Sequence, residues 1–476
     1  MSRGGTVLEP DLCVIGAGSG GLSVAAGAAA FGVSVVLVER GRMGGECLNT
    51  GCVPSKALIA AARHAQDARD AGRFGIRLGE PQTDWAVVHA HLRQAIDAIA
   101  PHDSVERFTS LGVRVVQAQA RFTDPRTVEA GGQVIRARRF VIATGSSPRI
   151  PDIPGLWDIP FLSNETLFEE PRAIRHLIVL GGGAVGVEMA QAHRRLGAAV
   201  TLVTRGELLS REDPELVAPL HARLEAEGVA LRLRATVARA ERGEGGAVRL
   251  ALGGGAVIDG SHLLVATGRR PILDGLGLDA AGIPYDADGI RVAADLRTAN
   301  RRVYAVGDCV SGSPRFTHAA NYHAGLVIRS ALFRLPVRVD PRRVPRAVYA
   351  APELAQIGLT EAEARARGID PTVLRVPFTQ NDRARASGDV SGLVKLVAGP
   401  RGRILGIGIS GPEAGEQIHL WSLALAKNLK LSDVAGAILP YPTLGEAGKR
   451  AAVAYFAGAA KNPWLRGLLR VLRVFG

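Results

Sequence analysis

Apolar and polar positions follow the same order in two separate parts of the chain. A short apolar run at 11–15 is followed by the glycine-rich stretch GAGSGG, an alanine-rich run at 22–31 and a second apolar run at 33–38. The same order recurs from Leu177, with GGGAVG as the glycine-rich stretch. Short apolar runs are typical of buried strands, and the longer run between them has the length of a helix. The pattern therefore predicts two strand–helix–strand units of an α/β fold.

The first glycine-rich stretch has the spacing of a dinucleotide-binding turn. Gly16 allows the tight turn, Gly18 lets a pyrophosphate approach the backbone, and Gly21 allows the helix to pack closely on the strand. The following helix points the positive end of its dipole at the phosphates. Glu39 ends the second strand, where a carboxylate can accept hydrogen bonds from ribose hydroxyls. This unit is predicted to bind an adenine dinucleotide.

The repeat predicts a second dinucleotide site. The glycines in the same three roles are Gly181, Gly183 and Gly186. No carboxylate ends the second strand of this unit; Thr204 stands there, followed by Arg205 and then by Arg211. A carboxylate would repel a 2′-phosphate, whereas arginine binds one through paired hydrogen bonds. NADP is therefore expected rather than NAD, and the alternative is that both arginines are ordinary surface residues.

The rest of the chain completes the expected architecture. A strand at 303–307 delivers Asp308 at its carboxyl end, the edge where ligands bind in α/β sheets, and the helix after Thr317 would point its N-terminus at the same ligand. A helical region is expected at 84–111 and a proline-rich linker at 146–155. From about residue 345 the pattern is rich in strands and then helical at 413–428, which predicts a third, α+β domain.

Composition narrows the function classes. The 476 residues are 47% hydrophobic, enough for a large core, and Lys+Arg 58 against Asp+Glu 45 gives a net charge of +13. That excess is spread thinly and favours anionic ligands such as phosphorylated cofactors, without the basic and aromatic clusters of a nucleic-acid-binding protein. The N-terminus lacks the apolar core of a signal peptide. A reducing cytoplasm is the expected location, where a pair of cysteines is more often catalytic than structural.

The stretch GGECLNTGCVPSK at 44–56 holds two of the four cysteines, Cys47 and Cys52. Across a first helical turn their sulfurs can approach within disulfide range. A helix N-terminus and the neighbouring Lys56 favour a thiolate. A zinc site would need two more Cys or His ligands at short spacing, and none is nearby, so no metal site is expected. The motif predicts a redox-active pair.

Together and in this order, these motifs resemble the class I pyridine nucleotide–disulfide oxidoreductases, which include lipoamide dehydrogenases, glutathione reductases and mercuric reductases. The resemblance covers about residues 8–458 and implies an α/β fold of two Rossmann-like domains plus a C-terminal α+β dimerisation domain. The implied division is an FAD-binding domain in two parts (1–150 and 272–345), an NAD(P)-binding domain (151–271), a dimerisation domain (346–460) and a basic amphipathic tail (461–476).

The resemblance also assigns roles to residues. Cys52 would be the thiolate against the flavin and Cys47 the exposed interchange thiol. Lys56 would sit near the flavin and pair with Glu188, which keeps the lysine charged and oriented. Asp308 would bind the ribityl chain of FAD. The remaining implied cofactor contacts are Thr144 and Gly145, Gly268 in the second such turn, and Thr317 to Ala320 near the pyrimidine edge of the flavin.

The C-terminal segment departs from the family pattern. The thiol-handling members carry a histidine, supplied by the partner subunit of a homodimer and oriented by a glutamate. Here Tyr441 replaces the histidine, and Glu446 is retained. A phenol of pKa about 10 is a poor proton acceptor at neutral pH. Mercuric reductases place a tyrosine in a comparable segment, but this chain lacks their C-terminal cysteine pair, since no cysteine follows Cys309.

These observations predict an FAD enzyme that passes electrons from NADPH through the Cys47–Cys52 disulfide to a small-molecule or metal-ion acceptor. It is most like a mercuric reductase without the C-terminal cysteines. The alternatives are a dihydrolipoamide dehydrogenase-like enzyme and a redox-sensing flavoprotein. In the tail, leucines at 465, 468, 469 and 472 share one helical face opposite three arginines. Such a helix suits either docking on its own dimer or contact with a membrane surface.

Overall fold

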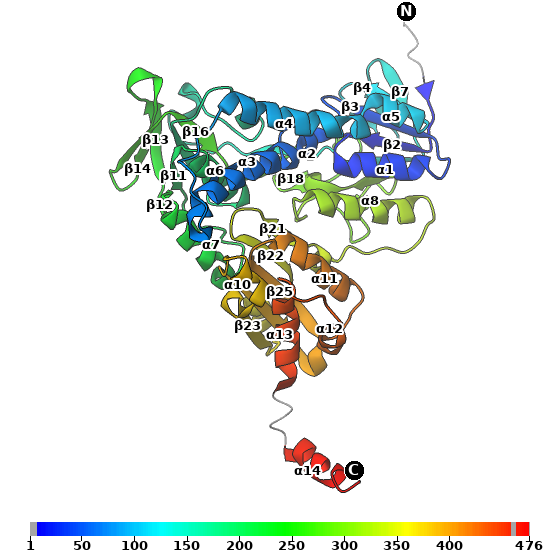
Figure 1. The fold of residues 1–476 in the computed structure, drawn as a ribbon. Coiled ribbons are helices and arrows are strands. Elements are labelled where there is room, and N and C mark those ends of the chain that lie inside the picture. Colours follow the sequence, from blue (N-terminus) through cyan, green and yellow to red (C-terminus); the bar gives the residue numbers. More distant parts are fainter. Residues whose placement is uncertain (1–6, 458–462, 476) are drawn as a thin grey trace, which may run out of the picture. The chain divides into compact units, whose positions relative to one another are not determined.

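The computed structural model describes residues 7–457 and 463–475, which form two compact units (Figure 1). Of the described residues, the first unit comprises 7–181, 195–203 and 235–341, and the second comprises 182–194, 204–234, 342–457 and 463–475.

A five-stranded parallel sheet forms the centre of the first unit. Its strand order is β20-β8-β2-β3-β4. The strands are β2 (Leu12–Ile15), β3 (Val35–Glu39), β4 (Val113–Gln117), β8 (Arg139–Ile142) and β20 (Val303–Ala305). The helices α1 (Ser19–Ala29) and α8 (Thr317–Ala331) pack side by side on it (Figure 1). β2 is buried along its whole length, as expected for a parallel strand with both faces covered.

The second predicted strand–helix–strand repeat is also present. β10 (His176–Leu180) pairs in parallel with β11 (Ala199–Val203) on one side and with β16 (His262–Val265) on the other. α6 (Ala184–Arg195) lies between β10 and β11 in the sequence. Both predicted repeats therefore fold as parallel α/β units, which confirms the expected fold class.

The structure also contains smaller sheets. One has the order β1-β7-β6-β5 and another β13-β14-β15. Their strands are β1 (Val7–Leu8), β5 (Arg121–Asp124), β6 (Thr127–Ala130), β7 (Gln133–Ile135), β13 (Val237–Arg242), β14 (Val248–Leu252) and β15 (Val257–Gly260). The pairs are β9 (Ser146–Pro148) with β17 (Arg269–Pro271) and β18 (Tyr285–Asp286) with β19 (Gly289–Ile290). The predicted linker at 146–155 thus begins with a strand that is paired along its length.

The predicted helical region at 84–111 is present, divided into two helices: α4 (Trp85–Ile99) ends in a 3₁₀ turn that contains Pro101, and α5 (Val105–Ser110) begins after Ser104, which caps it. Proline lacks the backbone donor that a continuing helix needs. The cysteine stretch is also divided, into α2 (Gly45–Asn49) and α3 (Cys52–Asp70), so the two cysteines do not share one helical turn.

The second unit contains the predicted α+β domain. Its antiparallel sheet has the order β21-β22-β25-β24-β23. The strands are β21 (Arg346–Val348), β22 (Glu353–Gly358), β23 (Thr372–Pro377), β24 (Leu393–Ala398) and β25 (Ile404–Gly411). The other elements are α7 (Pro214–Ala226), β12 (Ala230–Arg232), α9 (Glu361–Ala366), α10 (Asp382–Ala386), α11 (Ala414–Ala426), α12 (Leu431–Gly436), α13 (Glu446–Ala457) and α14 (Pro463–Leu472).

A buried ion cluster joins this sheet to α7 and α9. Lys395 on β24 is only 4% exposed, and its Nζ contacts Asp213 at 2.8 Å, Glu215 at 2.6 Å and Glu361 at 2.9 Å. Arg375 on β23 donates to Glu215 from its Nε, at 2.5 Å, and from its Nη2, at 2.7 Å. The hydrogen bond from Arg375, and then that from Lys395, lowers the pKa of Glu215 to about 2. Two cations thus hold three carboxylates.

We predict that Lys395→Ala destabilises the protein, because it leaves buried carboxylates with a single cation. Breaking a buried ion pair typically costs about 3–5 kcal/mol, and thermal unfolding at pH 7 measures the loss. The exposed Lys427→Ala is the matched control and should unfold like the parent.

The pH dependence of this loss has a fixed sign. The folded-state pKa of Glu215 is depressed, so its contribution is present above its ordinary pKa of 4.5 and is lost as pH falls toward about 2. The difference in stability between the parent and Lys395→Ala should therefore become smaller over that range. An equal difference in stability at pH 7 and pH 2.5 would contradict the cluster's role.

Candidate active site

Cys47 and Cys52 lie on either side of a break between two helices. Cys47 is in α2, and Cys52 is the first residue of α3. Thr50 and Gly51 between them have non-helical backbone angles. The break turns the chain so that Cys52 takes the N-terminal position of α3, where the helix dipole favours a thiolate.

The two thiols influence each other directly. A hydrogen bond from the Cys47 thiol is the largest factor that lowers the pKa of Cys52, which falls to about 6. Burial opposes this shift, and the Thr317 hydroxyl, whose Oγ1 lies 3.3 Å from the Cys52 sulfur, and the Lys56 charge add to it. The same thiol–thiolate bond, with burial, raises the pKa of Cys47 far above its ordinary value. At pH 7 Cys52 is therefore the thiolate and Cys47 the thiol that donates to it.

Cys52 is the more exposed of the two, whereas Cys47 is half-buried. Which of the two acts as the interchange thiol stays a prediction. The exposed thiolate lies beside Thr317, at the start of α8, which is where the resemblance locates the flavin edge. The other two cysteines are buried, and burial raises the pKa of Cys13 to about 12 and that of Cys309 to about 11. They are therefore poor nucleophiles at neutral pH.

The predicted FAD residues lie at the carboxyl ends of neighbouring strands. Gly16 follows β2, Glu39 ends β3, Thr144 and Gly145 follow β8, and Asp308 follows β20. These strands are adjacent members of one parallel sheet, so the four chain segments meet at one edge. Ligands in open α/β sheets bind at this edge.

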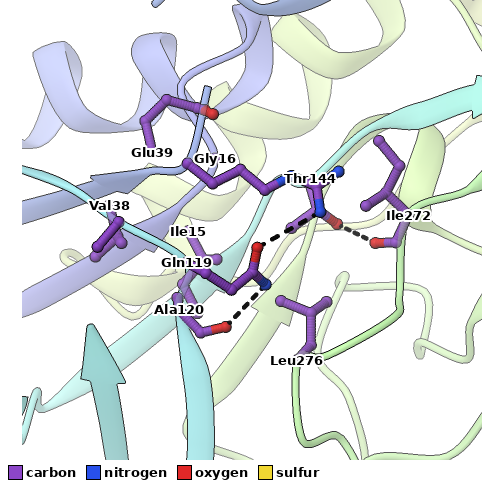
Figure 2. A pocket seen from close by; sticks show the side chains of 11 residues that line it. Ile15, Gly16, Val38, Glu39, Gln119, Ala120, Thr144, Ile272 and Leu276 are labelled. Atoms are coloured by element: carbon purple, nitrogen blue, oxygen red, sulfur yellow. Dashed lines mark hydrogen bonds between the residues drawn. The ribbon is translucent and has the colours of Figure 1, made fainter. Parts of the chain in front are cut away.

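Glu39 and Gly16 line a pocket there (Figure 2). The Glu39 carboxylate accepts hydrogen bonds from the backbone N–H groups of Ala17, at 2.5 Å, and Gly41, at 2.7 Å. Gly16 has φ +105°, and a Cβ there would come within 2.4 Å of the Ala143 carbonyl oxygen. A Cβ on Gly18 would meet nothing nearer than 4.0 Å, so the backbone at the helix start faces open space. An acid for ribose hydroxyls and an open backbone for phosphates fit the adenosine diphosphate part of FAD.

The other predicted contacts flank this edge. Thr144 donates to the Ile272 carbonyl at 2.7 Å, and Asp308 accepts a hydrogen bond of 2.5 Å from Ser146. Ala320 lies on α8, which packs on α1 near Gly20. The structure therefore brings the predicted FAD residues and the cysteine pair together within the first unit.

The predicted NADP residues belong to both units. Each unit is described separately, and in each the predicted glycines lie at the ends of the expected strands and helix. In the first unit Gly181 has φ +126° and approaches Ala266 as Gly16 approaches Ala143, with a Cβ-to-oxygen distance of 2.3 Å; Gly268 follows β16. In the second unit α6 begins just after Gly183 and contains Gly186. Arg205 and Arg211 are exposed, and no described carboxylate forms an ion pair with either arginine.

Glu188 is buried on α6, where its Oε1 accepts a hydrogen bond of 2.9 Å from the backbone N–H of Tyr349. Lys56 lies on α3 in the first unit. The pairing of Lys56 with Glu188 stays a prediction.

Tyr441, in the C-terminal segment, has a hydrogen-bond partner that the sequence did not predict. Tyr441 is 70% exposed and donates from its hydroxyl to Asp382 at 3.2 Å. This hydrogen bond and the charge of Asp382 raise the pKa of Tyr441. The Glu446 carboxylate instead accepts a hydrogen bond of 3.3 Å from the backbone N–H of Thr443. Asp382 is 59 residues from Tyr441, and no local pattern indicated the contact.

The described part of the tail is helical. α14 exposes Leu468, Leu469 and Leu472, and Trp464 near its start is 87% exposed. Residues 461–462 and 476 of the predicted tail lie outside the described residues. Among the residues with described positions, no helix has both the length and the apolar character to cross a bilayer. The same residues include no group of three or more His, Cys, Asp or Glu side chains that could hold a metal ion.

We predict that alkylation separates the two redox cysteines. In reduced protein, iodoacetamide should label Cys52 with a midpoint near pH 6, because the thiolate is the nucleophile. Cys47→Ala removes the hydrogen-bond donor, so the Cys52 midpoint should move toward its ordinary value of 9.0. Peptide mass spectrometry across pH 4–10 reads both sites. Cys47 labelled before Cys52 at pH 7 would contradict the assignment of the thiolate.

Comparison with known proteins gives consistent matches along the chain. Residues 10–324 match the family described as pyridine nucleotide-disulphide oxidoreductase, and residues 344–452 match the dimerisation domain of that family. A mercuric reductase of Streptomyces lividans is 37% identical over 466 residues, covering 95% of this chain and 97% of that protein. A dihydrolipoyl dehydrogenase of Thermus scotoductus is 37% identical over 463 residues, covering 93% and 97%.

Solved structures include a similar protein as well. The HOCl-induced flavoprotein disulfide reductase RclA from Escherichia coli superposes with a TM-score of 0.83 at 26% identity, covering 93% of this chain and 99% of that one. A Cu(II) complex of the same protein superposes with a TM-score of 0.82.

Proposed function

The chain belongs to the pyridine nucleotide-disulphide oxidoreductases, which are FAD-dependent enzymes, and on this premise we propose that it transfers electrons from NADPH to a soft metal-ion acceptor through Cys47 and Cys52. The observation that carries the proposal is the break between α2 and α3, which places Cys52 at the N-terminus of α3 with its sulfur 3.3 Å from the Thr317 hydroxyl oxygen, where the Cys47 thiol lowers the pKa of Cys52. Such a pair is already ionised for reaction at neutral pH.

The residues of this chain have separate tasks in the proposed enzyme. FAD, when bound, would supply the two-electron chemistry between the nicotinamide and the cysteine pair. The open glycine turn and Glu39 would bind its adenosine diphosphate part, and Asp308 its ribityl chain. Thr317 keeps a hydroxyl beside the Cys52 sulfur, and Cys47 keeps a proton available to it. Lys56 is proposed to stabilise the thiolate form, and Glu188 to keep that lysine charged and oriented.

A metal-ion acceptor is favoured by the surroundings of Tyr441. Dithiol exchange needs a group that takes a proton at neutral pH. Because Asp382 raises the pKa of Tyr441, this phenol stays protonated and cannot serve as that base. Reduction of a metal ion needs no such base. Mercuric reductases among the relatives, and a Cu(II) complex of RclA, support this class of acceptor.

Two alternatives have support of their own. The relative named dihydrolipoyl dehydrogenase favours a dithiol substrate, and the HOCl-induced RclA favours a redox-sensing role. The enzyme is proposed to be a cytoplasmic homodimer, supported by the match of residues 344–452 to the dimerisation domain. Tyr441 and Glu446 of one subunit would then serve the cysteine pair of the other. The basic, amphipathic α14 would lie on that dimer or on a membrane surface.

Anaerobic NADPH oxidation tests the proposal. The acceptors are Hg(II) with excess thiol, Cu(II) without added thiol, lipoamide, glutathione disulfide and a quinone, each with the parent, Cys47→Ser and Tyr441→His. We expect a metal ion to be the best acceptor for the parent and Cys47→Ser to abolish that activity. Tyr441→His should raise lipoamide activity, by up to the 10²–10⁴-fold that a positioned base contributes.

Three outcomes separate the readings. Lipoamide turnover by the parent at about 10 s⁻¹, a median enzyme rate, would overturn the metal-ion proposal in favour of a dithiol substrate. Slow turnover with every acceptor, together with peroxide-dependent association, would favour the sensor. Metal-dependent NADPH oxidation that survives Cys47→Ser would show that the pair is not the route.

Arg205 and Arg211 are proposed to select NADPH by binding its 2′-phosphate. Hydrogen bonds to charged groups contribute roughly 1.5–3 kcal/mol each, or tenfold and more. The double alanine variant should therefore lose kcat/KM for NADPH by at least about tenfold and change little with NADH. Exposed Arg401→Ala is the control for lost positive charge. Equal kcat/KM of the parent with the two nucleotides would contradict the preference.

A further inference from the structure

A second cluster of charged and polar residues binds the redox segment, residues 44–56. Its members come from distant parts of the sequence. Glu46 directly precedes Cys47 in α2. Arg269, the first residue of β17, grips both oxygens of the Glu46 carboxylate: Nη1 donates to Oε1 at 2.6 Å, and Nη2 donates to Oε2. Asn164 donates to the same Oε1 at 2.8 Å and to the Thr50 carbonyl at 3.2 Å. The stretch from Glu46 to Thr50 is therefore fixed at both ends.

Arg269 is itself held by several partners. Its Nε donates to the Ser146 hydroxyl at 2.7 Å, and its Nη2 donates to the Ser146 carbonyl at 2.7 Å. The Asp308 carboxylate lies 3.7 Å from its Nε and accepts a hydrogen bond of 2.5 Å from Ser146. The side chains of Arg269 and Asp308 are 19% exposed, and that of Glu46 is 32% exposed. A bidentate arginine–carboxylate pair with this much burial has a well-defined geometry.

The charges in this cluster do not balance. One guanidinium serves two carboxylates, so the clamp of Glu46, Arg269 and Asp308 carries a net negative charge. Burial is the main factor that raises the pKa of Glu46, to about 7; Asp308 and the Cys52 thiolate raise it further, and Arg269 opposes them. The carboxylate and the thiolate therefore repel each other across a partly buried site. A disulfide has no such charge, so the repulsion acts on the reduced pair alone.

We propose that Glu46, clamped by Arg269 and Asn164, is a positioning residue that fixes the redox segment and lowers the reduction potential of the Cys47–Cys52 disulfide. The inference rests on the proposed redox role of this pair. Reduction by a dithiol cleaves the S–S bond, adds two electrons and one proton, and leaves the Cys47 thiol and the Cys52 thiolate. The reductant becomes a disulfide in turn. At pH 8, above the pKa of Glu46, the ionised carboxylate disfavours the thiolate product and makes the pair a stronger reductant.

The test is the midpoint of the pair in dithiothreitol redox buffers at pH 8, where the Glu46 carboxyl is mostly ionised, measured on the FAD-loaded protein. Acid quenching, alkylation and peptide mass spectrometry give the reduced fraction of Cys47 and Cys52 in each buffer. Glu46→Gln keeps the size and the Asn164 contact but removes the charge. Glu46→Asp keeps the charge with a shorter reach, and the exposed Glu165→Gln removes a charge next to Asn164 but outside the clamp.

Glu46→Gln should shift the thiol–disulfide equilibrium toward the reduced pair by about tenfold, which corresponds to about 30 mV for a two-electron couple. Glu46→Asp and Glu165→Gln should remain within about twofold of the parent. If Glu46→Gln fails to fold, Glu46→Thr, also neutral, must show the same shift.

Other results would overturn the inference in distinguishable ways. The redox midpoint could be unchanged in a folded Glu46→Gln, or it could shift equally in Glu46→Asp. Either result would show that the Glu46 contacts are structural and do not set the reduction potential. A parent protein whose cysteines form no disulfide in any buffer would instead refute the proposed function itself.

Discussion

The contact on which the site depends is the close approach of the redox segment to the first glycine turn. Gly44 donates from its N–H to the Ala17 carbonyl at 3.0 Å, and a Cβ on Gly45 would come within 2.7 Å of the Gly18 Cα. Both Gly44 and Gly45 have positive φ, which glycine adopts without strain. Two backbones without side chains can touch here, and this contact sets the cysteine pair beside the phosphate-binding end of the sheet.

At this position, hydrogen bonds and charges lower the pKa of Cys52 against the opposing effect of its burial. The helix break gives Cys52 the start of α3, Cys47 donates to it, and the clamp of Glu46, Arg269 and Asp308 sets a negative field beside it. Although the chain carries a net charge of +13, the redox segment lies beside two carboxylates, Glu46 and Asp308, as well as two cations, Arg269 and Lys56. Local arrangement, not overall composition, determines the chemistry of the pair.

The sequence was sufficient where function depends on neighbours along the chain. Gly16, Gly18, Glu39, Asp308 and the cysteine pair were predictable, because parallel strands bring their ends to one edge. The contacts that tune the site join distant residues: Arg269 is 223 residues from Glu46, and Tyr441 meets Asp382 only after the second unit has folded. No periodicity encodes such pairs. The break between α2 and α3 was missed because its residues have no strong helix-ending signal other than Gly51.

The most direct test of the account is the state of the four cysteines before and after one equivalent of NADPH under anaerobic conditions. In the oxidised holoenzyme, alkylation after denaturation and peptide mapping should find Cys47 and Cys52 joined and Cys13 and Cys309 free. NADPH should convert Cys47 and Cys52, and no other residues, to labelled thiols. Labelling of the two that is the same with and without NADPH would contradict the claim that electrons pass through this pair.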